Sequence, residues 1–158
     1  MAFSSLPSHL DADISSARLI VCERDGSWSV ALRCELAEAG VRVWECRSLA
    51  EAWEALAKTP AAFVIAEATR ENLDGLLRQM AWFSRDFPQA RIAVVAPRNM
   101  ARFQWLVREA GAVHFLVSPR QLSSLAALAT RHLASVPQPP QTMVQRIWAS
   151  LPWGPAET

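Results

Sequence analysis

Short apolar segments alternate with amphipathic segments five times along this chain, and this alternation restricts the fold more than any other feature of the sequence. The apolar segments have the length of buried strands and span residues 18–22, 41–46, 61–67, 90–96 and 112–118. Segments with a helical spacing of apolar residues follow them, at 27–40, 49–58, 73–87, 100–111 and 122–136. Strands that alternate with helices form parallel sheets covered on both faces. We therefore predict a three-layer α/β/α sandwich around a five-stranded parallel sheet.

Residues typical of helix ends mark several of the amphipathic segments. Ser48 and Glu51 have the spacing of a capping box at the start of the second segment. Gly40 and Gly111 end the first and fourth segments, as glycines commonly do at helix C-termini. These positions predict helices joined to strands by short connections.

The length and composition limit the class of protein. A chain of 158 residues, with 51% apolar and 20% charged residues, fits one globular domain and does not fit a disordered chain. Its net charge of +1 argues against a nucleic-acid or membrane-surface partner. The three cysteines lack metal-ligand spacing, and no apolar run is long enough to span a bilayer. We expect a cytoplasmic protein with reduced thiols and no metal or cofactor.

The composition of the two ends differs from that of the centre. We predict a flexible leader over residues 1–16, one folded domain over 17–136, a Pro-rich linker over 137–142 and a short amphipathic tail over 143–158. The tail places Trp148 on an apolar helical face, which suits docking onto the domain, onto a second copy or onto a partner. No output domain follows in this sequence, so we expect a stand-alone module.

Three local sequences resemble the receiver domain of two-component response regulators. "GAVHFLVSP" at 111–119 resembles the segment of that family with Gly-Ala, an aromatic residue and Lys-Pro at the end of the fifth strand. "EATRENLDGLL" at 67–77 resembles the segment from the phosphorylated Asp to the Asp-Gly of the third helix, and "LIVCERD" at 19–25 resembles the first strand with its acids. The resemblance covers roughly residues 18–136 and implies a flavodoxin-like fold with strand order 2-1-3-4-5.

The family resemblance implies a phosphoacceptor Asp, which takes a phosphoryl group from a histidine kinase, and two acids that hold Mg²⁺. Glu67 stands at the phosphoacceptor position in this chain. Glu23 and Arg24 stand at the positions of the two acids, with Asp25 next along. An Arg at a ligand position repels the ion. Glu67 is also one methylene longer than Asp, which would misplace an attacking carboxylate.

The resemblance also implies a Ser or Thr after the fourth strand and a Lys after the fifth, which bind phosphate oxygens. Ala96 stands at the first of these positions and Ser118 at the second. The only lysine of the chain, Lys58, lies on the predicted second helix, far from the strand ends. We therefore predict a degenerate phosphoacceptor pocket with no catalytic residue and no metal, made of Glu67, Glu23, Arg24, Asp25, Ala96 and Ser118.

A guanidinium is the usual partner of a partly buried carboxylate. We predict that Glu67 pairs with the side chain of Arg24, with Arg98 as a second candidate. Glu67 would then either mimic the phosphorylated state or only fill the pocket, and the sequence leaves both open.

Aromatic residues mark candidate interfaces. Phe115 matches the switch aromatic of the family, and an ordinary core position explains it at least as well. Trp105 and Trp148 suit core or interface anchors.

These observations predict an atypical receiver, or pseudo-receiver, that acts through protein contacts and is not an enzyme. The expected partners are a histidine kinase or another signalling protein. A homodimer through the fourth helix, fifth strand and fifth helix is also expected, because this face commonly dimerises in the family that the chain resembles. Two alternatives remain: a phosphorelay receiver that uses a non-standard acid, and a small-ligand-binding flavodoxin-like module.

Overall fold

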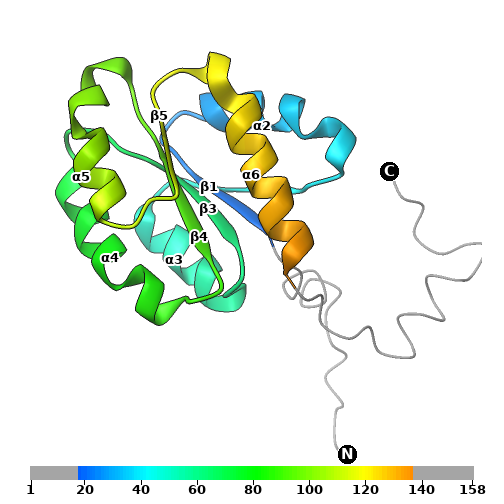
Figure 1. The fold of residues 1–158 in the computed structure, drawn as a ribbon, viewed down its shortest axis with the longest axis horizontal. Helices are drawn as coiled ribbons and strands as arrows, with labels where there is room; N and C mark the ends of the chain where they lie inside the picture. The colour runs from blue at the N-terminus through cyan, green and yellow to red at the C-terminus, as the bar shows by residue number, and fades with distance from the viewer. Residues whose placement is uncertain (1–17, 137–158) are drawn as a thin grey trace, which may run out of the picture.

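The sheet of the protein has the predicted strand order. The computed structural model describes residues 18–136, which form a parallel sheet of order β2-β1-β3-β4-β5 with helices on both faces (Figure 1). The strands are β1 (Leu19–Cys22), β2 (Val43–Cys46), β3 (Phe63–Glu67), β4 (Arg91–Val95) and β5 (His114–Leu116). The fold class and topology predicted from the sequence are therefore confirmed. The predicted leader, linker and tail lie outside the described residues.

The helices fall into two layers. They are α2 (Ser27–Glu35), α3 (Leu49–Lys58), α4 (Leu73–Asp86), α5 (Gln104–Glu109) and α6 (Leu122–Ser135), with short 3₁₀ turns η1 (Ala37–Ala39), η2 (Arg98–Phe103) and η3 (Pro119–Gln121). Buried side chains of α3, α4 and α5 pack on one face of the sheet, and those of α2 and α6 pack on the other. Among residues 18–136, no helix combines the length and the apolar character needed to cross a membrane.

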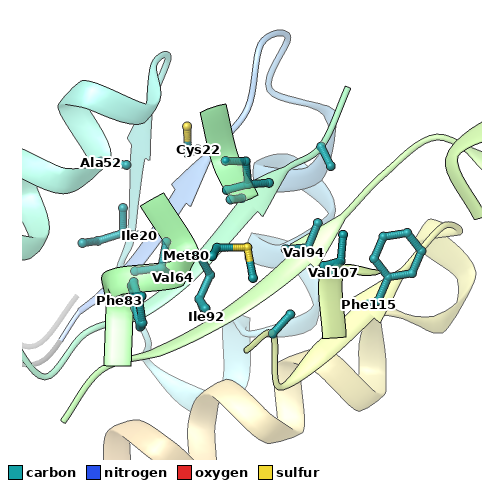
Figure 2. Close-up of a cluster of buried hydrophobic side chains, with 14 of the residues drawn as sticks. Ile20, Cys22, Ala52, Val64, Met80, Phe83, Ile92, Val94, Val107 and Phe115 are labelled. Carbon is teal, nitrogen blue, oxygen red and sulfur yellow. The ribbon is translucent and has the colours of Figure 1, made fainter. Parts of the chain in front are cut away.

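The strands are buried on both faces because their side chains alternate between the two layers. In β1, Ile20 points into the α3–α4–α5 layer and Val21 points into the α2–α6 layer, and neither side chain is exposed. Figure 2 shows Met80 of α4 beside Ile92 of β4 in the first of these layers. Burying one such side chain contributes roughly 1.5–3 kcal/mol, so this double-sided burial is the main source of stability.

The predicted capping box at the start of α3 is confirmed. The Ser48 hydroxyl accepts a hydrogen bond from the Glu51 main-chain N–H at 3.2 Å. The Glu51 carboxylate in turn accepts the main-chain N–H of Arg47 at 2.9 Å, one residue before the cap. Together these bonds satisfy two amide groups that the helix start would otherwise leave without partners.

Two of the predicted helices are interrupted. The first α-helix ends at Glu35, and the separate turn η1 carries the chain to Gly40, whose φ of 64° is left-handed. The fourth begins as η2, where the Met100 N–H donates to the Pro97 carbonyl at 2.9 Å. No side chain caps this start, and bonds between residues three apart tighten it into a 3₁₀ turn.

Two buried cysteines lie side by side in the sheet. Cys22 of β1 and Cys46 of β2 are partners in the parallel register, and their side chains are 5% and 2% exposed. Burial, with smaller contributions from Cys46 and nearby acids, raises the pKa of the Cys22 thiol to about 12. Burial also raises the pKa of the Cys46 thiol to about 11, whereas Cys34 is exposed on α2.

We expect these two thiols to make the fold sensitive to alkali. The folded protein holds both protons above the ordinary thiol pKa of 9.0, so the contribution of these thiols to the free energy of unfolding should be constant below that pH. It should fall as the pH rises from 9.0 toward the raised values, by up to about 1.4 kcal/mol per pH unit for each thiol. Urea unfolding at a series of pH values measures this fall. The chain has no tyrosine and one lysine, so few other groups titrate there.

The double variant C22A/C46A should lose most of this alkaline dependence, and C34A should keep it because Cys34 is exposed. An unchanged slope in the double variant would contradict the assignment.

Candidate functional site

A cleft of about 300 Å³ lies at the carboxyl ends of β1 and β3. Its lining brings together three of the predicted site residues: Glu23, Arg24 and Glu67. Asp25, Ala96 and Ser118 do not line this cleft. Three of the six predicted residues therefore lie together at this cleft, and the other three lie outside its lining.

Glu23 is a buried helix cap. Its side chain is 2% exposed. Its Oε2 accepts the main-chain N–H of Trp28 at 2.8 Å, and its Oε1 accepts the N–H of Ser29 at 2.6 Å and the Ser29 hydroxyl. Gly26, with a φ of 87°, stands at the N-cap position and has no side chain to do this. Glu23 thus supplies from the strand the acceptor that the first turn of α2 lacks.

Glu67 is held by main-chain atoms. Its Oε2 accepts the main-chain N–H of Arg24 at 3.0 Å. The Arg24 guanidinium points elsewhere and binds the Glu71 carboxylate at 2.5 Å, where both side chains are at least 70% exposed. The predicted ion pair between Glu67 and the Arg24 side chain is therefore wrong. No ion pair in the described part of the chain joins Arg98 to Glu67 either.

The loop after β3 is braced by two side chains that the sequence analysis missed. The Asn72 amide donates to the Glu67 carbonyl at 2.8 Å, and its Oδ1 accepts the Thr69 N–H at 2.8 Å. The Thr69 hydroxyl accepts the Asn72 N–H at 3.3 Å. The three-residue spacing of Thr69 and Asn72 before a helix is the signal that could have found them.

Arg47 is a second residue that the sequence analysis missed. Its guanidinium donates to the Arg24 carbonyl at 3.3 Å and to the Glu45 carboxylate at 3.0 Å. It therefore connects the segment after β2 to the segment after β1. Nothing in the sequence pattern distinguishes Arg47 from the other arginines.

Ala96, Ser118 and Asp25 lie outside the lining of the cleft. Ala96 is fully buried, and its main-chain N–H donates to the Leu116 carbonyl at 2.9 Å. The Ser118 hydroxyl accepts the Arg120 N–H at 3.4 Å and begins η3. Asp25 is exposed in the segment between β1 and α2.

The aromatic residues divide between core and surface. Phe115 is 7% exposed and lies beside Val107 of α5 in the same layer (Figure 2), which is the core position that the sequence left open. Trp105 lies on α5 and is 71% exposed. Trp148 is outside the described residues.

The acids do not fit a magnesium site as they are arranged. Mg²⁺ needs several oxygen ligands at 2.0–2.1 Å in near-octahedral geometry. Both Glu23 oxygens already accept N–H or O–H donors, and Glu67 Oε2 accepts an N–H group. Over residues 18–136, no three His, Cys, Asp or Glu side chains are placed to hold a metal ion together. The cleft can make hydrogen bonds and ion pairs, and its carboxylates are already used for internal ones.

We expect loss of the Glu23 cap to destabilise the protein. E23Q replaces one acceptor oxygen by an amide NH₂ that faces main-chain donors, so it should lower the free energy of unfolding by about 1–3 kcal/mol. Urea unfolding followed by tryptophan fluorescence measures this change.

D25N is the matched control, because Asp25 is an exposed acid in the same segment. We expect it to change the unfolding free energy by less than about 0.5 kcal/mol. Equal urea midpoints for E23Q and the unmodified chain would contradict the capping role.

No protein-family model matches this chain, and no curated protein matches it in sequence. Among solved structures it is similar to a response regulator from Thermotoga maritima, with a TM-score of 0.60, 18% identity, and coverage of 75% of this chain and 99% of that one. It is also similar to an orphan response regulator of H. pylori, with a TM-score of 0.61, 15% identity, and coverage of 75% of this chain and 98% of that one. A third similar structure is the beryllofluoride-activated NtrC4 receiver domain dimer, with a TM-score of 0.60, 18% identity, and coverage of 73% of this chain and 94% of that one.

These likenesses agree with the topology and extend over most of the described residues. At 15–18% identity they show the fold and not the activity. The chain therefore has the fold of response-regulator receiver domains, as the resemblance in its sequence predicts.

Proposed function

We propose that this chain is a pseudo-receiver: a receiver-like domain without the phosphorylation chemistry, which acts as a signalling module through protein contacts and not as an enzyme. The observation that carries the proposal is the buried Glu23 carboxylate, whose two oxygens cap α2. An ion at these oxygens would compete with the three donors of the helix for the same carboxylate.

The other replaced positions support the same proposal. Phosphoryl transfer depends on positioning and on cations that neutralise the transferring group. Glu67 is longer than Asp and bound to the Arg24 N–H, while Ala96 and Ser118 supply neither the hydroxyl nor the ammonium group at the usual places. A displacement of about 1 Å in such a site can cost a hundredfold in rate.

Signalling proteins, including a histidine kinase, are the partners that the receiver-like fold favours. A second copy of the chain is a further proposed partner, through the face of α5, β5 and α6. The support is that one structural neighbour is a receiver domain dimer and that Trp105 and Leu106 of α5 are exposed. Analytical ultracentrifugation tests this part of the proposal, and a monomer at all concentrations would overturn it.

We expect acetyl phosphate with Mg²⁺ to leave the intact mass of the purified protein unchanged, while a phosphorylatable receiver domain in the same mixture gains a phosphoryl group. The physical reason is the absence of a free carboxylate set for the ion. Mass spectrometry under non-acidic conditions measures the result. An added phosphoryl group on this chain would overturn the proposal and support the phosphorelay alternative.

The same reasoning predicts a flat Mg²⁺ titration. Trp28 donates its main-chain N–H to Glu23, so an ion that took Glu23 as a ligand would disturb this tryptophan. The intrinsic tryptophan fluorescence of the protein should therefore not change between micromolar and millimolar Mg²⁺. A saturable change that E23Q abolishes would show that the ion reaches Glu23.

Small-ligand binding in the cleft is the second candidate. The cleft has a volume of about 300 Å³, which reaches the size of the smallest ordinary ligand pockets. It also lies at the carboxyl ends of the strands, where folds of this kind bind ligands. The guanidiniums of Arg24 and Arg47 are engaged by Glu71 and Glu45, which leaves a ligand few free donors.

A further inference from the structure

The two most exposed tryptophans in the described part of the chain lie on two helices of one layer. Trp105 on α5 is 71% exposed and Trp82 on α4 is 58% exposed. Both helices pack on the same face of the sheet, through Met80 and Val107. Exposed tryptophans are costly in water and are enriched at the centres of protein interfaces.

The two helices are also neighbours. They follow the adjacent strands β3 and β4, and Figure 1 shows them in one layer. The chain leaves α5 through Gly111, where a Cβ atom would lie 3.9 Å from the Ser84 hydroxyl of α4. The segment after α5 therefore runs beside α4 near Ser84. We call the outer surface of α4, η2 and α5 the tryptophan face.

Arginines flank each tryptophan at helical spacing. Arg78 and Arg85 lie four residues before and three after Trp82. Arg108 lies three residues after Trp105 on α5, a spacing that shares a helix face. Arg102 lies three residues before Trp105 in the turn η2, with its guanidinium 4.8 Å from the centre of the Phe103 ring. The Arg85 guanidinium lies 5.5 Å from the centre of the Trp82 ring.

These four arginines have no carboxylate partner within residues 18–136. Arg24, Arg33 and Arg47 are instead among the described residues that form ion pairs. The tryptophan face carries five arginines against three acids, with the acids at the ends of the helices: Asp74, Asp86 and Glu109. Positive charge beside exposed aromatic rings is complementary to an acidic, partly apolar partner.

We propose that the tryptophan face is a docking surface for an acidic segment of a partner protein that also carries aromatic or aliphatic side chains. The tryptophans contact the apolar side chains, and the flanking guanidiniums bind the carboxylates. This inference does not depend on whether the cleft accepts phosphate, so it can stand or fall separately from the pseudo-receiver proposal.

The test uses the full chain and a short fluorescein-labelled peptide rich in Glu, Asp and Phe, with binding measured by fluorescence anisotropy. We expect saturable binding that weakens as salt increases. W82A and W105A should each weaken it roughly tenfold, and R78A/R108A should weaken it similarly. Urea unfolding checks that each variant remains folded, which exposure of these side chains favours.

W44A is the matched control. Trp44 is 50% exposed and has the Arg18 guanidinium 5.0 Å from its ring centre, on edge strand β2 beside a separate cavity of about 320 Å³. We expect W44A to bind the peptide as the unmodified chain does. Equal weakening by W44A and W105A would overturn the proposal.

Other probes give the remaining outcomes. We would measure the binding of three further probes in parallel. These are a peptide with Lys in place of the acids, oligothymidylate, and vesicles of phosphatidylcholine with phosphatidylserine. Binding of the Lys peptide as tightly as the acidic one, or binding of oligothymidylate or vesicles without the acidic peptide, would overturn the proposal. So would a W105A variant that loses self-association in the ultracentrifuge but binds the acidic peptide normally.

Discussion

The hydrogen bonds from the first turn of α2 to Glu23 organise the whole carboxyl edge of the sheet. They attach α2 to the end of β1 and require the chain to turn sharply through Gly26. A charged carboxylate is stable at 2% exposure because three donors replace its water. The same bonds engage both oxygens of a carboxylate that lines the cleft, so one interaction supports the fold and limits the chemistry of the site.

The contacts around Glu67 follow from that arrangement. Once β1 ends at the helix cap, the next main-chain N–H, that of Arg24, faces the end of β3 and binds Glu67. The Arg24 side chain then extends to Glu71, in an exposed pair that water screens. The main-chain N–H of Arg24, and not its guanidinium, is therefore the group that holds Glu67.

The sequence predicts the fold well because strand burial and helix capping are local patterns. The apolar run at 61–67 predicts a buried strand, and the pair Ser48 and Glu51 predicts a helix start. Both are observed. The partner of Glu67 could not be predicted in this way. It depends on which atoms of Arg24 face β3, and the turn at Gly26 decides that. The hydrogen bonds of Asn72 join residues that are close in the sequence, so its three-residue spacing to Thr69 could have predicted them.

Glu67 could mimic a phosphorylated residue only if its charge influenced a distant surface. In receiver chemistry a hydroxyl after the fourth strand would carry that influence toward the fifth, but Ala96 is buried and offers none. Phe115 is packed in the core, and no described hydrogen bond links Glu67 to β5. A group without different contacts in two states shifts no equilibrium. We infer that Glu67 fills the pocket and does not mimic a phosphorylated residue.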